Sequence, residues 1–453
     1  MNKPSRTTFR ARLQEMIHTL RTQIESGELQ SGDYLPSENR LGEIFRLSKK
    51  SVRTGLEQLV ADNLIRKIPR VGNQIIGPAA STSSVNTIRV GYYASLNTDA
   101  AMDQMIEQFQ QRYPNIRVQG IELPFEDYYK TTSQYVQHQM IDVVTLSHSD
   151  YLKYKENDQL DLFTPLQIHP QTFSTLNRAF EHKGDIYAEP FVFSPVILCY
   201  NKDHFRQLGL PEPDRGWTWH KLSELLMRIK DNSNHFGFYF HLMSDNRWPI
   251  FLLQSEASFH RNENGELCAD SHAYDGLSLC RDLIYNQGFP FYISEKDEDT
   301  DALFIEQKIS MMMTTYFGLN HLQNVPFEYD IAPLPAYKND STLLLATGAA
   351  VSAQSDRLDA ARAFVDYLIS EEGQSVIRQH TLSIPANQRI SEQTVRPELS
   401  APARYHMYRH ITHTFRLHSD LNLSTSDLSA IRDRLKFFWS NIEQTMACKS
   451  LTY

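Results

Sequence analysis

Lysine and arginine are concentrated at the front of this 453-residue sequence. The first 77 residues carry thirteen Lys and Arg against eight Asp and Glu, whereas the remaining residues carry 32 against 46. Cations on one face of a short helix, or at the tip of a hairpin, can contact the phosphates of a nucleic acid. An ordinary solvated face is the alternative, since an excess of five charges is modest. The cations concerned are Lys49, Lys50, Arg53, Arg66, Lys67 and Arg70.

Polar side chains follow two apolar segments further along the chain. The segment 87–93 (TIRVGYY) ends in Tyr93 and is followed by Ser95, and the segment 141–146 (IDVVTL) is followed by Ser147 and Ser149. If both segments are parallel strands, their carboxyl ends meet at one edge of a sheet, where ligands gather. These four residues are therefore predicted to contact a small molecule.

Helices and strands must position these cations, and the first 77 residues contain the patterns of three helices and a β-hairpin. Apolar residues at three- and four-residue spacing predict a helix over residues 9–24. Ser37 and Ser48 are placed to cap two further short helices. Residues 63–76 (NLIRKIPRVGNQII) predict a β-hairpin with a basic tip. The predicted buried positions of the two short helices are Leu41, Ile44, Phe45, Val52, Leu56, Leu59 and Val60.

The segment from Leu35 to Ile76, which reads LPSENRLGEIFRLSKKSVRTGLEQLVADNLIRKIPRVGNQII, resembles the GntR-type winged helix. The resemblance implies that Lys49, Ser51 and Arg53 contact DNA from the recognition helix and that Gly72 lets the wing approach the backbone. The sequence departs from the family pattern in three ways. Arg40 lies one position after the usual arginine, Lys49 replaces an arginine, and Arg70 replaces a wing glycine.

Residues 87–453 show alternating strand and helix patterns after a small, polar linker over residues 78–86. A β-α-β-α-β order over residues 87–146 predicts a mostly parallel sheet covered by helices. Six segments in order, among them IRVGYY, FQQRYPNIRV and WTWHKLSELL, resemble the extracellular solute-binding protein family 1. That resemblance implies two α/β lobes of the type II periplasmic-binding-protein kind, joined by strands that cross near Pro190–Tyr200 and Thr342–Val351.

The same resemblance implies a sugar as ligand, bound between the lobes. Sugars are recognised by aromatic platforms and by planar or hydroxylic polar groups. Most of the 22 Tyr and 24 Phe must serve packing instead, Asp142 can cap or pair locally, and Arg247 can either bind the carboxylate of an acidic sugar or lie on the surface. The predicted ligand-binding residues are Tyr93, Trp248, Tyr316 and Phe317 for stacking, and Ser95, Ser147, Ser149 and Thr347 for hydrogen bonds, with Asp142 and Arg247 as further candidates.

Several functional classes find no support in the sequence. It has no run of 18 apolar residues, no secretory signal pattern and no familiar catalytic motif, so we expect a cytoplasmic protein without enzymatic activity or cofactor. The four cysteines lack metal-ligand spacing and are expected to be free thiols. His406, His410 and His413 would share one helical face, but no further ligand is spaced to complete a metal site.

The sequence thus predicts a multidomain protein, with a winged helix-turn-helix (α+β) in residues 1–77 and a two-lobed α/β sensor in residues 87–453. The predicted function is a transcription regulator whose affinity for an operator depends on a small ligand, for which the resemblance implies a sugar. The GntR resemblance further implies a homodimer on a palindromic operator. Two alternatives stay open: a GntR-type head fused to a pyridoxal-phosphate aminotransferase-like enzyme, and a transport-type solute-binding protein.

Overall fold

A computed structural model describes residues 6–25, 29, 32–68, 72–76, 86–290 and 297–439. The chain divides into two compact units, Met1–Val85 and Asn86–Tyr453, which we call the head and the sensor. Each has its own hydrophobic core. The predicted linker lies outside the described residues except for Asn86, the first residue of a strand.

The head is a winged helix-turn-helix, as predicted. Three helices precede a two-stranded antiparallel hairpin: α1 (Arg6–Glu25), α2 (Glu38–Ile44), α3 (Lys49–Ala61), β1 (Ile65–Ile68) and β2 (Gly72–Ile75). The two predicted caps are confirmed, because Ser37 Oγ accepts from the Arg40 backbone N–H at 3.3 Å and Ser48 Oγ accepts from the Ser51 N–H at 3.3 Å.

The core of the head is narrower than the sequence indicates. Leu41, Val52, Leu56 and Leu59 are buried as predicted, but Ile44 is 52% exposed and Val60 is also exposed. On α2 the contact stripe runs through Leu41 and Phe45, four residues apart, which leaves Ile44 at its edge. The two predictions for Ile44 and Val60 are therefore wrong.

The sensor is built on one sheet with the strand order β4-β3-β5-β14-β8-β12-β9, to which β13, β15 and β16 add at the sides. The three strands of residues 87–146 pair in parallel as predicted, β3 with β4 and with β5, whereas β14 pairs antiparallel to β5 and β8, so the complete sheet is mixed. The strands are β3 (Asn86–Tyr93), β4 (Ile116–Leu123), β5 (Val143–Ser147), β8 (Glu189–Asn201), β9 (Phe236–Tyr239), β12 (Ile309–Thr315), β13 (Tyr329–Ala332), β14 (Thr342–Val351), β15 (Ile384–Pro385) and β16 (Phe415–Arg416).

The first lobe, which we call the N lobe, contains β3, β4 and β5. Its helices are α4 (Leu96–Asp99), α5 (Met102–Arg112), α6 (Tyr128–Gln137), α7 (His148–Glu156), α8 (Ser174–Asn177), α14 (Leu358–Ile369), α15 (Glu371–His380) and α16 (Gln388–Ser391), with the short hairpin β6 (Glu181–His182) and β7 (Asp185–Ile186). The helical segment between β3 and β4 is divided into α4 and α5, because Ala101 adopts a left-handed backbone (φ 51°) between them.

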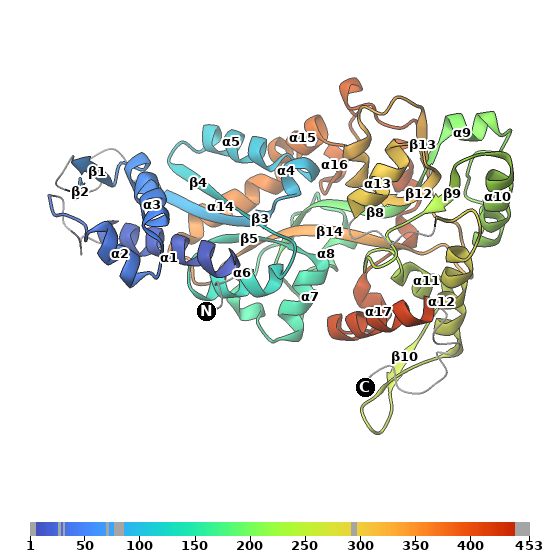
Figure 1. Cartoon of the computed structure of the whole chain (residues 1–453), viewed down its shortest axis with the longest axis horizontal. Coiled ribbons are helices and arrows are strands. Elements are labelled where there is room, and N and C mark those ends of the chain that lie inside the picture. Colours follow the sequence, from blue (N-terminus) through green and yellow to red (C-terminus); the bar gives the residue numbers. More distant parts are fainter. Residues whose placement is uncertain are drawn as a thin grey trace. The chain divides into compact units, whose positions relative to one another are not determined.

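The second lobe, the C lobe, contains β9, β12 and β13. Its helices are α9 (Lys202–Gln207), α10 (Trp219–Asn232), α11 (Pro249–Ser255), α12 (Ser271–Ile284) and α13 (Asp297–Ile305), with the hairpin β10 (Phe259–Arg261) and β11 (Leu267–Ala269). The predicted stripe of α10, from Leu222 to Ile229, is buried. Two strands, β8 and β14, connect the lobes at the predicted places, and Figure 1 shows β14 running from one lobe to the other.

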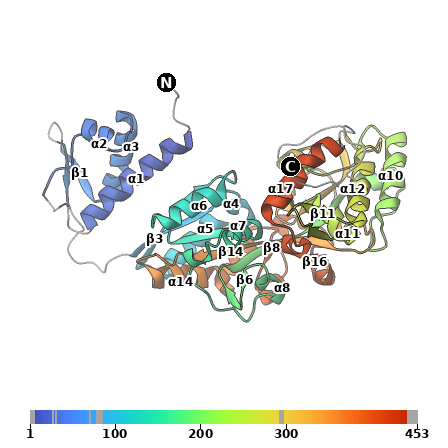
Figure 2. The same cartoon turned by 90° about the horizontal axis from the view of Figure 1, so that it is seen from below.

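A late segment, residues 415–439, contributes β16, η6 (His418–Leu421) and α17 (Thr425–Trp439), and we call it the strap. Ion pairs and hydrogen bonds join the strap to the C lobe. Arg261 pairs with Asp427 at 2.8 Å, and Arg432 pairs with Asp245. Tyr285 Oη donates to the Trp439 carbonyl at 2.6 Å. Figure 2 shows α17 beside α11 and α12. Among the described residues, no helix combines the length and the hydropathy needed to span a bilayer.

Candidate DNA-binding and ligand-binding sites

The candidate DNA-contacting side chains lie on the outer surface of α2 and α3. Lys49 and Lys50 are exposed at the first turn of α3. Arg53 follows one turn later, with a side chain that is 55% exposed and an Nε that donates to both carboxylate oxygens of Glu38 at 2.9 and 3.1 Å. Arg40 is exposed and pairs with Glu43 at 2.9 Å. These ion pairs orient the guanidinium groups but are solvated, so a phosphate can compete for them.

Two of the predicted head residues have placements that the sequence did not indicate. Ser51 is buried, and its hydroxyl lies 2.7 Å from the hydroxyl of the cap residue Ser48, so it supports the helix start and does not face outward. Gly72 opens β2 with φ +147°, a backbone conformation that favours glycine. Arg70 lies outside the described residues.

In the sensor, the predicted strand ends come together. Tyr93, at the end of β3, accepts a hydrogen bond from the Ser147 N–H at 2.9 Å and donates to the Asp150 carboxylate. Ser147 caps α7 and its hydroxyl also donates to Asp150 at 2.9 Å, while Lys153 pairs with the other oxygen of that carboxylate at 2.9 Å. Burial raises the pKa of Tyr93 well above its ordinary value. The carboxyl ends of β3 and β5 therefore form one polar network, with Ser95 exposed and Ser149 half-buried beside it.

An aromatic residue at this edge was missed by the sequence reasoning. Phe125 follows the carboxyl end of β4, is 72% exposed, and lies with its ring centroid 5.6 Å from that of Tyr93. Tyr93 stacks in turn on Tyr128, at 3.8 Å and an interplanar angle of 21°. The rule that ligands gather at strand ends also points to Phe125, because this residue follows the second strand of the run just as Tyr93 and Ser147 end the first and the third. Among the described residues of this edge, Phe125 offers the most accessible ring face.

Other predicted ligand-binding residues are buried in the structure. Trp248 is 0% exposed and its indole N–H donates to Asp245 Oδ1 at 3.2 Å. Tyr316 is also fully buried and donates to the Tyr405 carbonyl at 2.7 Å, while Phe317 beside it is half-buried. Thr347 pairs with Ser147 inside the sheet. The described conformation leaves Trp248 and Tyr316 no free ring face, so their stacking role stays a prediction that requires the lobes to separate.

The two additional polar candidates are engaged within the protein. Asp142 is buried and accepts hydrogen bonds from the backbone and the guanidinium of Arg89 and from Ser355, and these donors lower the pKa of its carboxyl despite burial. Arg247 is buried and donates to the carbonyl oxygens of Asn246 and Met313. The local pairing considered for Asp142 is therefore what the structure shows.

The histidine-rich segment does not form the single helical face that its spacing indicated. His406 and His410 belong to the 3-10 helix η4 (Tyr405–His410), and His413 belongs to another, η5 (Thr412–Thr414). Within the described ranges, no group of three or more His, Cys, Asp or Glu is arranged to hold a metal ion. Cys199, Cys268 and Cys280 are free thiols, and Cys448 lies outside those ranges.

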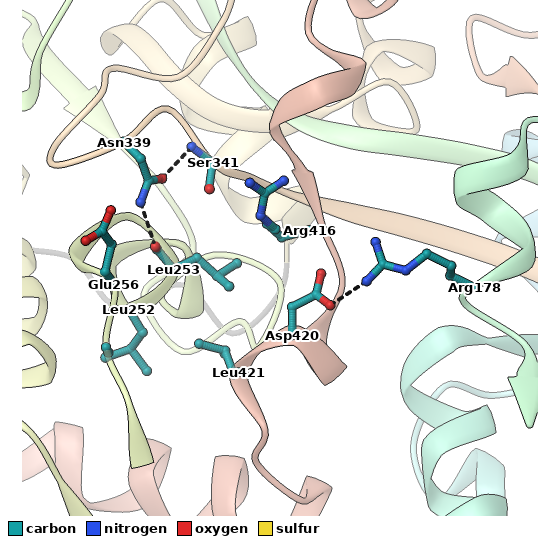
Figure 3. Close-up of a pocket in the computed structure, with 10 residues that line it drawn as sticks. Arg178, Leu252, Leu253, Glu256, Asn339, Ser341, Arg416, Asp420 and Leu421 are labelled. Carbon is teal, nitrogen blue, oxygen red and sulfur yellow. Dashed lines mark hydrogen bonds and ion pairs between the residues drawn. The ribbon is translucent and has the colours of Figure 1, made fainter.

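A pocket of about 440 Å³ opens where the lobes and the strap meet. Arg178 reaches it from the N lobe and pairs with Asp420 of the strap at 2.7 Å, as Figure 3 shows. The volume of this pocket lies in the range found for small-molecule binding sites. None of the eight predicted ligand-binding residues lines it. The lining residues are Arg178, Leu252, Leu253, Glu256, Ala257, Asn339, Ser341, Arg416, Asp420 and Leu421.

Comparison with known families accounts for both units. Residues 13–75 match the model of the gntR family of bacterial regulatory proteins. Residues 93–375, more than half of the chain, match the model of bacterial extracellular solute-binding proteins. The chain belongs to the bacterial extracellular solute-binding protein family. Unlike a plain solute-binding protein, this member carries a GntR-type winged helix before the family fold.

Curated relatives of this solute-binding protein resemble only part of it. A putative binding protein of Brucella abortus is 23% identical over 212 residues, 45% of this chain and 51% of the relative. The sn-glycerol-3-phosphate-binding periplasmic protein UgpB of Brucella abortus is 25% identical over 163 residues, 34% of this chain and 37% of that protein. The chain therefore spans about half, or less, of the length of the curated relatives it matches.

Solved structures resemble the solute-binding fold over most of its length. The GacH receptor of Streptomyces glaucescens, solved unliganded and with acarbose, is 16% identical, with a TM-score of 0.68, covering 79% of this chain and 94% of its own. An ABC substrate-binding protein of Listeria monocytogenes, in complex with cycloalternan, is 20% identical, with a TM-score of 0.64, covering 80% and 100%. These likenesses establish the two-lobed fold and exclude the aminotransferase-like alternative for the sensor.

Proposed function

We propose that this protein is a cytoplasmic transcription regulator in which a small ligand, bound between the sensor lobes, controls the affinity of the head for an operator. We further propose that the ligand is a carbohydrate, that the protein has no catalytic activity, and that it acts as a homodimer on a palindromic site. The observation that carries the proposal is the union in one chain of a winged helix with exposed cations on α3 and a two-lobed ligand-binding fold.

Both the strand-end network and the related solved structures support a carbohydrate as the ligand. The strand-end network offers hydroxyl and carboxylate groups beside the exposed ring of Phe125, a combination that suits a hydroxylated molecule with apolar faces. The related structures were solved with acarbose and cycloalternan. A ligand that prefers one arrangement of the lobes shifts the equilibrium by its difference in affinity, and that shift is the means by which it can change DNA binding.

The experiment is a DNA titration of the full-length protein against duplexes that it selects from a random-sequence pool. Arg53→Ala should weaken binding by about tenfold. Arg112→Ala is the matched control, because it removes one exposed cation from the sensor. A carbohydrate that raises the unfolding temperature of the protein should then change its affinity for the selected duplex. Absence of any salt-sensitive duplex binding, or an equal loss with Arg112→Ala, would contradict the proposal.

A further inference from the structure

Two buried histidines face each other where the strap meets the N lobe. His148 is the first residue of α7, and His418 is the first residue of η6. Each side chain is buried, the ring centroids are 6.2 Å apart, and the ring planes are inclined by only 24°. Both residues lie in histidine-rich stretches of the sequence, 138–150 and 405–418, but nothing in the sequence pairs them, because the two stretches are distant.

Each ring uses one nitrogen within the protein and leaves the other without a partner. His148 Nδ1 lies 2.7 Å from the Ala179 carbonyl oxygen, and His418 Nε2 lies 2.9 Å from the Asp245 carbonyl oxygen. Because a carbonyl oxygen only accepts, these two nitrogens carry the ring protons. The remaining atoms, His148 Nε2 and His418 Nδ1, are buried and have no hydrogen-bond partner among the described residues.

Both rings are neutral, so each free nitrogen offers a lone pair. Burial lowers the pKa of His148 to about 3, and the neighbouring His418, Lys155 and Arg178 act in the same direction. Burial also lowers the pKa of His418. Two buried acceptors without donors are costly, and a ligand that brings hydroxyl groups would satisfy them. A carboxylate or a phosphate dianion has no proton to donate, so the hydroxyl groups of a ligand, and not its anionic groups, would satisfy these two acceptors.

The two acceptors also belong to different lobes. His148 is part of the N lobe, whereas Asp245 holds His418 to the C lobe, and the carboxylate of Asp245 is fixed by Trp248 and Arg432. Arg178, which precedes Ala179, and Asp420, two residues after His418, line the interlobe pocket, whereas neither histidine lines it. A ligand that donates to both rings would therefore connect the lobes.

We propose that His148 and His418 accept hydrogen bonds from hydroxyl groups of a polyhydroxylated ligand through their two free nitrogens, and thereby couple ligand binding to lobe closure. The inference rests on the proposed function and adds two ligand-binding residues to it. A divalent cation is the competing occupant, because two neutral imidazoles can also ligate a metal.

The test uses two variants that keep each internal hydrogen bond and remove only the free acceptor. His148→Asn retains a side-chain N–H at the position of Nδ1, toward Ala179, and His418→Gln retains one at the position of Nε2, toward Asp245. His204→Asn, at a buried histidine of α9 that bonds to Ser310, is the matched control. The full-length protein is screened by unfolding temperature against uncharged saccharides including maltose, against glucose 6-phosphate, glucuronate and sn-glycerol 3-phosphate, and against ZnCl2.

We expect at least one saccharide of this panel to raise the unfolding temperature. The dissociation constant for that saccharide should rise roughly tenfold to fiftyfold in each variant and stay unchanged in His204→Asn. Stabilisation by no saccharide, or by Zn²⁺ in a manner that both variants abolish, would overturn the inference, as would saccharide binding that neither variant weakens.

The DNA titration separates this inference from the proposed function. One outcome is that the saccharide binds in a way that requires both histidines and yet leaves the DNA affinity unchanged. That result would support the role of His148 and His418 in ligand binding and contradict the regulatory function. If the saccharide changes DNA affinity equally in the wild type and in both variants, the function stands and the pair fails.

Discussion

The head and the sensor place their working side chains in opposite environments. On α3 of the head, Lys49, Lys50 and Arg53 are exposed, lie within five residues, and contribute little to the fold. In the sensor, the two histidines that meet where the strap joins the N lobe are buried, and His418 is held by Asp245 from a distant part of the chain. The proposed DNA contacts of the head can therefore be removed without disturbing its fold, whereas the proposed ligand contacts of the sensor belong to its core.

Trp248→Ala tests this comparison with the largest expected effect. The ring is fully buried and bonds to Asp245, so its removal leaves a cavity and should cost about 3–5 kcal/mol of the sensor's stability. Calorimetry on the full chain should show a lower unfolding temperature for the sensor and an unchanged one for the head. Trp248→Phe should recover most of the loss. Lost ligand binding with unchanged stability would instead restore the stacking role predicted from the sequence.

The sequence patterns that proved reliable are local ones. The caps Ser37 and Ser48 each follow from residues within one segment, and both are confirmed. The predicted meeting of Tyr93 with Ser147 is also confirmed, because it needs only that β3 and β5 pair in parallel.

What the sequence could not supply depends on how distant segments pack. An aromatic residue such as Trp248 is equally compatible with a platform and with a core, and only tertiary contacts decide between them. The same holds for Ile44, which the helical period marks as buried but which lies at the edge of a narrow stripe. The pairing of His148 with His418 has no local signature at all. Buried sites are therefore harder to predict than exposed ones.

Within the head, the exposed Lys50 and the buried Ser51 are neighbours on α3, so the same comparison can be made within one helix. Lys50→Ala should leave the unfolding temperature of the head unchanged, because the side chain is exposed, and should reduce the slope of DNA affinity against salt by about one unit. Ser51→Ala removes the buried hydroxyl beside Ser48 and should destabilise the head by about 1 kcal/mol while leaving that slope unchanged. A changed slope for Ser51→Ala would show that its hydroxyl turns outward to reach DNA.

The smallest effect is expected from His321 in the C lobe, whose pKa responds to nearby carboxylates. His321 Nδ1 lies 2.7 Å from Asp301 Oδ2, and this hydrogen bond raises the pKa of the imidazole above its ordinary value against the opposing effect of burial. Asp99 of the N lobe and Glu298 raise it further. Because the folded-state pKa is raised, the stabilisation is complete below the ordinary pKa of about 6.5 and is lost as the pH rises through the folded value.

The side chain of His321 is 37% exposed, so solvent screening should limit the effect to a few tenths of a kcal/mol, and to about 1 kcal/mol at most. Urea unfolding at pH 6 and pH 8 should show a larger loss of stability for the wild type than for His321→Gln, because the other titrating groups are common to both proteins. His220→Gln, at an exposed histidine of α10 near Glu224, should behave as the wild type. Parallel behaviour of the wild type and His321→Gln would mean that the ion pair contributes nothing to the stability of the sensor.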